Sequence, residues 1–335
     1  MCEMRCDDSA FVKWAVVLLS ACAACAASPL AWAQAYPAKP VRMIVGFPVG
    51  GTADIVARIL GRRLGERLQS QFVVDNRSGA GSVIGSEIAA RAAPDGYTLL
   101  MISSSHAISA GFREKLPYDP IRDFAGVSLV AAAPNVVVVN PSLPVKSIGD
   151  LIELARAKPG QLNYGSSGVG GNSHLAGELL KRMANIELTH VPYKGAAPAL
   201  TDVISGQAQV LLPTLPSVLS QVKAGRVRAI AVTSLKRSAA LPGVPTVAES
   251  GVPGYEATNW YGVLAPAATP ASIIDRLNAA IREALREAYV ASDLAAQGAE
   301  PVGSTCAEFE AYLKSEIAKW TRVIRDAGLG SGAGG

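Results

Sequence analysis

The sequence is poor in charged residues. Of its 335 residues, 17% are Asp, Glu, Lys or Arg, and no long block of one sign occurs. The formal net charge is only +4, and no basic stripe with interleaved aromatic residues is present. Nucleic acid is therefore a poor candidate partner. The mild positive balance suits anionic small molecules, although it decides little by itself.

Cysteine is scarce outside the first 25 residues. Four of the five cysteines lie there, and the fifth is Cys306. A chain that loses its first segment keeps Cys306 alone, so we expect no internal disulfide and no C-x-x-C metal site. His106 and His190 are isolated and lack metal-ligand spacing. No metal and no cofactor are predicted.

The N-terminus resembles an export signal. Lys13 precedes an apolar run over residues 14–27, which is too short to span a bilayer, and Ala31-Trp32-Ala33 follows it as a cleavage pattern. We therefore predict a signal peptide over residues 1–33. Leu19-Ser20-Ala21-Cys22 also resembles a lipobox, so a lipid anchor on Cys22 is an alternative. No other stretch is long and apolar enough to cross a membrane.

From Pro40 onward, short apolar runs alternate with amphipathic patterns. We expect strands at 41–46, 72–75 and 98–103, separated by helices at 54–68 and 82–92. This alternation predicts βαβ units and mostly parallel pairing. It resumes after Val136–Val139, with further expected helices near 148–158, 174–183, 197–205 and 216–224 and expected strands near 162–164, 188–191, 209–212 and 227–233.

Two extended stretches, 136–140 and 256–264, are candidate crossings between two lobes. The lobe that holds both chain ends would comprise residues 36–137 and 260–329, and the inserted lobe would comprise 138–259. Helical stripes over 273–285 and 309–324 would complete the first lobe. The Gly-rich residues 330–335 are expected to be a flexible tail.

The first loop of interest joins the strand at 41–46 to its helix. Its glycines allow a ligand to approach the backbone, and Thr52 or Asp54 can cap the helix. Free N–H groups at a helix N-terminus suit a carboxylate or a phosphate. No Lys follows the glycines, so the loop is not a phosphate-binding P-loop. A plain βα turn is the alternative. The candidate ligand-binding residues here are Phe47, Gly50, Gly51, Thr52, Ala53 and Asp54.

A second glycine-rich loop, 76–85, follows the next strand. Gly79-x-Gly81-x-x-x-Gly85 only loosely matches a dinucleotide fingerprint, and its spacing is wrong for one. Arg77 in this loop could pair with a carboxylate or could be solvated. Ser103 and Ser104, at the end of the strand at 98–103, are further candidates for the site.

The loop over residues 164–175 is the richest in polar groups. Hydroxyls, an amide and backbone N–H groups gather at a helix start, which makes an anion cradle without formal charge. Ser167 beside His174 also leaves an exported Ser/His hydrolase as an alternative, but no G-x-S-x-G elbow and no partnered acid is present. Lys194, in a later loop, could face the cleft or the solvent. The candidates in this loop are Ser166, Ser167, Gly168, Asn172, Ser173 and His174.

These loops all follow expected strands and precede expected helices. In open α/β sheets such loops gather at the carboxyl ends of the strands, where ligands bind. Two lobes that each offer such loops would enclose one small molecule. The residues therefore predict a binding protein more readily than an enzyme.

Several segments, in this order, resemble the Bug receptors, the periplasmic solute-binding proteins of tripartite tricarboxylate transport systems. The resemblance runs from about Tyr36 to Leu329. It is carried by Tyr36-Pro-x-Lys-Pro40, Phe47-Pro-x-Gly-Gly-x-x-Asp54, Asn76-Arg-x-Gly-Ala-Gly81, Pro94-Asp-Gly-Tyr97, Tyr164-Gly-Ser-Ser-Gly168, His190-Val-Pro-Tyr-Lys-Gly195 and Asn259-Trp260-Tyr-Gly262.

The resemblance implies a two-lobed α/β Venus-flytrap fold of the periplasmic-binding-protein type, with a mixed sheet in each lobe. It also implies a periplasmic, monomeric, non-enzymatic receptor that passes its ligand to the membrane components of a transporter or to a sensor. Where the family usually has an acidic residue after the strand at 209–212, this chain has Pro213-Thr214. An amino-acid ligand is therefore disfavoured, and di- or tricarboxylates and aromatic acids are favoured.

Overall fold

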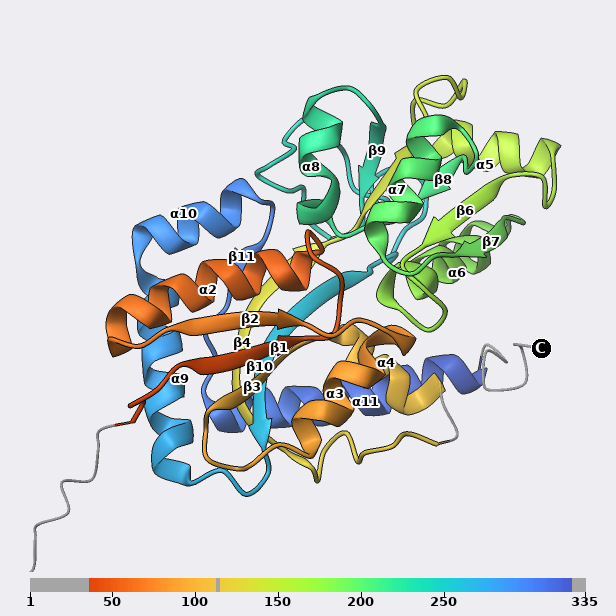
Figure 1. Cartoon of the computed structure of the whole chain (residues 1–335). Helices are drawn as coiled ribbons and strands as arrows, with labels where there is room; N and C mark the ends of the chain where they lie inside the picture. The colour runs from red at the N-terminus through yellow and green to blue at the C-terminus, as the bar shows by residue number, and fades with distance from the viewer. Residues whose placement is uncertain (1–35, 113–114, 327–335) are drawn as a thin grey trace, which may run out of the picture. The chain divides into compact units, whose positions relative to one another are not determined.

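The computed structural model describes residues 36–112 and 115–326. The predicted signal peptide with Cys22 and the predicted tail at 330–335 lie outside the described residues. From Lys39 onward the chain forms one compact unit, which contains two β-sheets (Figure 1).

The first sheet has six strands in the order β11-β4-β10-β3-β1-β2. Strand β1 pairs in parallel with β2 on one side and with β3 on the other, whereas β10 runs antiparallel to both β3 and β4. The sheet is therefore mixed. Its strands are β1 (Val41–Val45), β2 (Phe72–Asn76), β3 (Thr98–Ser103), β4 (Phe124–Pro134), β10 (Thr258–Pro266) and β11 (Glu300–Pro301).

The second sheet has five strands in the order β7-β6-β8-β5-β9. Strand β6 pairs in parallel with β7 and β8, and β5 runs antiparallel to β8 and β9. This sheet is also mixed, which confirms the predicted fold class. Its strands are β5 (Val136–Val139), β6 (Asn163–Ser166), β7 (Thr189–Pro192), β8 (Val210–Leu211) and β9 (Arg228–Val232).

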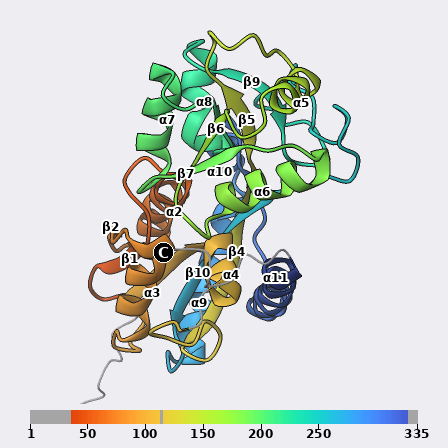
Figure 2. The same ribbon diagram turned by 90° about the vertical axis from the view of Figure 1, so that its right-hand side faces the viewer.

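Helices cover both faces of the first sheet, because its strands are apolar on both sides. Ile44, Leu100 and Ile102 form one face of the core with side chains from α3, α4 and α11. Figure 2 shows α11 on the opposite side of this sheet from α2. The helices are α2 (Thr52–Leu68), α3 (Val83–Ala90), α4 (Ser104–Phe112), α9 (Ala271–Arg286), α10 (Ala288–Ala296) and α11 (Cys306–Asp326), and a short 3-10 turn, η1, spans Ala80–Ser82.

The second sheet is sandwiched in the same way. Val137 and Val139 of β5 pack toward one core cluster, whereas Val136 and Val138 pack toward another, as the alternation of side chains along a strand requires. The first cluster includes residues of α5 (Ile148–Ala157) and α6 (Asn172–Ala184). The second includes residues of α7 (Ala196–Ser205) and α8 (Leu215–Lys223).

The chain passes between the two sheets at two buried points. Asn135 separates β4 from β5, and Ala257 immediately precedes β10. Thr233 links these points: its hydroxyl lies 2.9 Å from the carbonyl oxygen of Asn135 and 2.7 Å from that of Ala257. Both crossings are therefore tied together by one side chain that is completely buried.

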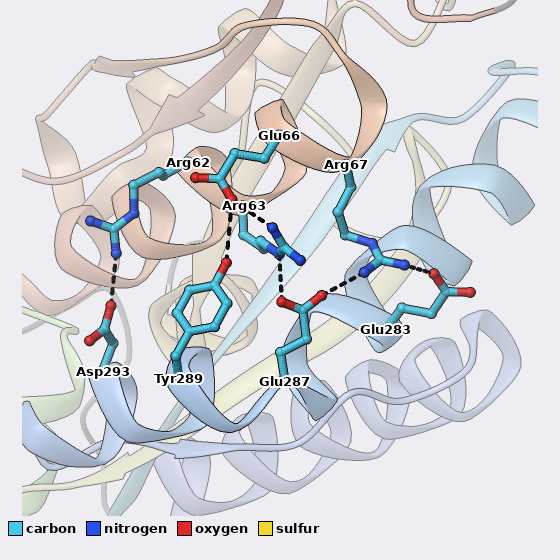
Figure 3. Close-up of polar contacts among 8 residues, drawn as sticks. All are labelled: Arg62, Arg63, Glu66, Arg67, Glu283, Glu287, Tyr289 and Asp293. Atoms are coloured by element: carbon cyan, nitrogen blue, oxygen red, sulfur yellow. Dashed lines mark hydrogen bonds and ion pairs between the residues drawn. The ribbon is translucent and has the colours of Figure 1, made fainter.

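A group of arginines on α2 anchors this helix to α9 and α10 (Figure 3). Arg63 and Arg67 both pair with Glu287, at the junction of α9 and α10. Arg67 also pairs with Glu283, and Arg62 pairs with Asp293 at 2.7 Å. Exposed ion pairs of this kind add little stability individually, but several together fix the orientation of α2.

The expected elements agree with the structure to within a few residues, and the structure adds four for which no element was predicted: α4, β4, α10 and β11. Helix α4 follows β3 without a loop, and residues 104–112 show no clear helical period. The expected parallel pairing does not extend to β10, which runs antiparallel to β3 and β4. No described helix is long and apolar enough to cross a membrane.

Candidate functional site

A cavity opens where strand ends of the two sheets meet. Its volume, counted as space open to the centre of a water molecule, is about 60 Å³. At about 10–15 Å³ for each water position, this accommodates a compact ligand. The lining residues are Phe47, Pro48, Val49, Gly51, Thr52, Ala53, Ser103, Ser105, Ser167, Asn172, Ser173, Gly195, Ala196, Ala197, Leu211, Pro213, Thr214, Asn259 and Tyr261.

The lining contains no Asp, Glu, Lys, Arg or His side chain. Its polar character comes from hydroxyls, two amides and the starts of helices. The first residues of α2, α6 and α7 all lie in the lining, and so does Thr214, the N-cap of α8. Each N-terminus carries a partial positive charge from its unpaired N–H groups. The cavity is therefore electropositive without any formal positive charge.

Glycine occupies the N-cap of the three helices whose first residues line the cavity. Gly51, Gly171 and Gly195 provide no side chain that could accept a hydrogen bond from the first turn. By contrast, α5 lies away from the cavity and has a complete capping box, in which Ser147 and Asp150 satisfy each other's N–H groups. The first-turn N–H groups at the cavity are thus available to an acceptor on a ligand.

Asp54 stabilises the loop between β1 and α2. Its carboxylate accepts hydrogen bonds from the N–H of Gly50 at 3.0 Å and from Arg58 at 2.9 Å. Burial would raise the pKa of Asp54, but the hydrogen bonds from Arg58, Gly50 and Asn76 together outweigh it and lower the pKa. Asp54 therefore stays ionised and holds the loop, while its charge is already paired.

The loop after β6 is held by two histidines. The N–H of Gly170 donates to Nδ1 of His174 at 3.2 Å, and the hydroxyl of Ser166 lies 2.6 Å from Nε2 of His190. The two imidazole rings stack on each other. Burial lowers the pKa of both, and in His190 burial together with the neighbouring His174 brings the pKa to about 4. Both rings are therefore neutral near pH 7.

The hydrolase alternative required Ser167 to be activated by His174. Instead, the hydroxyl of Ser167 lies 2.9 Å from that of Ser173, and Nδ1 of His174 is occupied by a backbone N–H. Ser166 does contact a histidine, but Ser166 is completely buried and does not line the cavity. Among the described residues, no cluster of three His, Cys, Asp or Glu side chains is suited to a metal ion.

Half of the candidate site residues lie in the cavity wall and half lie behind or beside it. Those in the wall are Phe47, Gly51, Thr52, Ala53, Ser103, Ser167, Asn172 and Ser173. Gly50, Asp54, Ser104, Ser166, Gly168 and His174 are instead bonded within the loops, as supports of the wall. Arg77 pairs with Asp75, and Lys194 is exposed outside the wall.

Several wall residues were not selected from the sequence. Gly195, Ala196 and Ala197 form the start of α7, where a helix start after a glycine was the available signal. Leu211, Pro213 and Thr214 follow the short strand β8, and Asn259 and Tyr261 belong to a motif noted only for its resemblance. Asn259 and Tyr261 reach the cavity because β10 returns the chain from the second sheet to the first. No local sequence pattern reveals this return.

Five polar residues at the cavity, which we call the polar chain, form two hydrogen-bonded groups. The hydroxyl of Ser104 donates to Oδ1 of Asn259 at 2.5 Å, and Nδ2 of Asn259 donates to the hydroxyl of Tyr261 at 2.8 Å. The hydroxyls of Thr52 and Thr214, which line the cavity together with Tyr261, lie 2.5 Å from each other. Burial raises the pKa of Tyr261, so its phenol stays protonated.

Two mixed α/β sheets that direct helix N-termini into a shared, uncharged cavity define a solute-binding receptor fold. Comparisons with known proteins agree with this class. Residues 56–329 match the family model described as "Tripartite tricarboxylate transporter family receptor". The chain therefore belongs to this receptor family. It is a solute-binding receptor and not an enzyme, and the hydrolase alternative has no support.

The similar proteins include curated and structurally solved members. BugT of Bordetella pertussis is 40% identical over 298 residues, which are 88% of this chain and 91% of that protein. A solved R. palustris protein, Rpa4515 with adipate, is 39% identical with a TM-score of 0.85, covering 88% of this chain and 98% of that one. MatC from Rhodopseudomonas palustris with bound malate is 29% identical with a TM-score of 0.81, covering 86% and 100%.

Proposed function

We propose that this chain is a periplasmic receptor that encloses a small carboxylate between two lobes. The observation that carries the proposal is the cavity wall, in which helix N-termini converge and no charged side chain is present. A carboxylate would accept hydrogen bonds from the free N–H groups and gain from the positive ends of the helices. The adipate and malate described with similar proteins are consistent with this ligand class.

The wall also limits which carboxylates fit. Phe47, Pro213 and Leu211 supply apolar surface, and no acidic side chain is present to pair with an amine. Di- and tricarboxylates and aromatic acids are therefore favoured over amino acids. This proposal includes all the candidate ligand-binding residues predicted from the sequence, both those in the wall and those that support the loops.

We place the crossings between the lobes at Asn135 and Ala257. The sequence-based boundaries, after residue 137 and before residue 260, differ from these by two residues. The pairing of Val136 with Val232 and of Thr258 with Pro134 supports the shifted positions. Closure of the lobes would then bring the two sets of helix N-termini onto one ligand.

The first experiment is a thermal unfolding screen of residues 34–335 against adipate, malate, citrate, benzoate and glutamate. A ligand at a hundred times its dissociation constant stabilises a protein by about 2.7 kcal/mol, which shifts the melting temperature measurably. We expect a shift with at least one acid, a smaller shift or none with glutamate, and no chemical change in the bound acid. No shift with any of the carboxylates would contradict the proposal.

The partners and the processing are also part of the proposal. The receptor would serve the membrane components of a tripartite transporter, or a sensor, as a monomer. Cleavage after Ala33 would release it into the periplasm, whereas modification of Cys22 would anchor it there. Mass spectrometry of the mature protein distinguishes these two routes, and size-exclusion chromatography with light scattering tests the monomer.

A further inference from the structure

The polar chain joins the first sheet to the second across the cavity. Thr52 begins α2 and Ser104 begins α4, two helices that pack on the first sheet. Asn259 and Tyr261 lie on β10, a strand of that sheet. Thr214 is the N-cap of α8, which packs on the second sheet, and it forms an isolated bridge with Asn135. The Thr52–Thr214 bond therefore spans the two halves of the unit.

Burial makes these bonds significant. The exposed fraction is 4% for Thr52, 2% for Tyr261 and 6% for Asn259. Thr214 is partly buried, so its bond to Thr52 lies at the edge of this buried group. A hydrogen bond shielded from water is stronger than one exposed to it, and a buried hydroxyl such as that of Thr52 is costly when it loses its partner without gaining water. An opening that carried α8 away from α2 would break the Thr52–Thr214 bond.

The hydrogen bonds among Ser104, Asn259 and Tyr261 fix which group donates and which accepts. Oδ1 of Asn259 accepts bonds from both the N–H and the hydroxyl of Ser104, so the amide group of Asn259 points its Nδ2 at Tyr261. Because the hydroxyl of Tyr261 accepts from Asn259, its own proton is not used in this bond. Ser104 and Asn259 thus orient the phenol of Tyr261 in the cavity wall, which Thr52 and Thr214 also line.

We propose that Thr214, with Thr52, is a latch that holds the two lobes closed around the cavity. This inference rests on the proposed function, because it describes how the same cavity is kept shut. The two residues act as positioning residues: their bond stabilises the closed arrangement, so that the helix N-termini of both lobes face the ligand together. Thr214 is the member that determines the effect, since it alone of the five lies on the second-sheet side.

The test measures closure without a ligand. Spin labels at Glu153→Cys on α5 and Lys314→Cys on α11, in a Cys306→Ser background, report the distance between the lobes by pulsed electron paramagnetic resonance; both native side chains are exposed. We expect a closed population in the unliganded parent protein. Thr214→Val keeps the shape but removes the hydroxyl, and should lower the ratio of closed to open by roughly fivefold, as for one net hydrogen bond.

Matched variants separate the latch from general stability. Thr214→Ser restores a hydroxyl and should restore the closed population. Thr189→Val removes a hydroxyl that bonds to the carbonyl oxygen of Gly160 at the surface of the second sheet, and should leave the distances unchanged. Thr52→Val combined with Thr214→Val should lower closure no more than either single change, because both remove the same bond.

Three outcomes would overturn the latch: no closed population in the unliganded parent protein, identical distances in Thr214→Val and its parent, or additive effects of the two valine substitutions. A receptor that binds none of the screened acids but shows the distance change would retain the latch and lose the proposed ligand class. The two proposals therefore fail separately.

Discussion

The imidazole rings of His174 and His190 stack with their centroids 4.1 Å apart, directly behind the loop that lines the second-sheet side of the cavity. The stack continues to the phenol ring of Tyr164, whose hydroxyl donates to Glu178. This stack of three rings supports the residues around Ser167 and Ser173. It is assembled from β6, α6 and β7, which are separate in sequence.

The histidines predict how stability depends on pH. Burial lowers the pKa of His106 to about 4, burial and the neighbouring His174 bring His190 to about 4, and burial lowers His174. In the unfolded chain each histidine has a pKa near 6.5, so acid protonates the unfolded state first. Stability is therefore complete above about pH 6.5 and falls as the pH decreases toward 4. Urea unfolding at pH 7.5, 6 and 4.5 measures this decline.

His106→Phe is the matched variant for this prediction. His106 is completely buried and packs against Tyr118 and Phe124, so a phenyl ring suits the site, although the bond to the carbonyl oxygen of Pro120 is lost. The decline between pH 7.5 and 4.5 should shrink by up to about 3 kcal/mol, the equivalent of the shift of His106. An equal decline in both proteins would assign the pH dependence to other groups.

Ala196→Pro tests the use of backbone N–H groups by the ligand. Ala196 is the first residue of α7, where proline is tolerated, and the extended ψ of 172° at Gly195 is compatible with a following proline. The substitution removes one N–H from the cavity wall. If adipate is bound there, its affinity should fall about 10- to 100-fold, since a hydrogen bond to a charged group contributes about 1.5–3 kcal/mol. Isothermal titration calorimetry measures this change.

The control for this variant is Ala271→Pro. It makes the same change at the first residue of α9, after Pro270, and away from the cavity wall. Adipate affinity should be unchanged there. Equal losses in both variants would indicate a general effect on folding, and no loss in Ala196→Pro would remove α7 from the anion-binding wall.

Gly262→Ala should destabilise the first lobe. A Cβ atom at Gly262 would lie 2.1 Å from Cζ of Phe309, which is completely buried. Overpacking of this kind costs about 1–3 kcal/mol in the free energy of unfolding, measured by urea denaturation. Gly243→Ala, where no atom lies within 4 Å of the added Cβ, should be nearly neutral.

A second variant makes the Gly262 prediction specific. Phe309→Leu shortens the opposing side chain, so Gly262→Ala should cost less in this background than in the parent protein. Equal costs in both backgrounds would mean that the clash with Phe309 is not the cause of the instability.

Thr233→Val should weaken the region where the chain crosses between sheets. The substitution keeps the buried shape but leaves the carbonyl oxygen of Ala257 without its hydroxyl donor. We expect a loss of about 1–3 kcal/mol in the free energy of unfolding. Thr201→Val on α7 removes an exposed hydroxyl bond to Ala197 and should have little effect. A neutral Thr233→Val would show that the hydroxyl does not hold the two crossings, and that packing and the backbone hydrogen bonds of residue 233 to Asn135 and Ala257 are sufficient.

Local patterns predicted most of the elements. Strand β3 begins and ends at the expected residues, and α2 and α6 begin two residues before their expected starts. The starts of α2 and α6 could be predicted because a glycine-rich loop before an amphipathic helix marks a helix N-terminus. The first loop, from Phe47 to Asp54, can consequently be predicted from the sequence as part of the candidate site.

The sequence by itself determined the alternation of strands and helices, the low charge of the loops and the positions of the glycine N-caps, because these depend on residues close together in the chain. Only the tertiary structure decided which of these loops meet. Thr52 and Thr214 are 162 positions apart, and their contact depends on both crossings at Asn135 and Ala257. Long-range pairing of this kind arises from packing of whole sheets, which leaves no mark on local sequence.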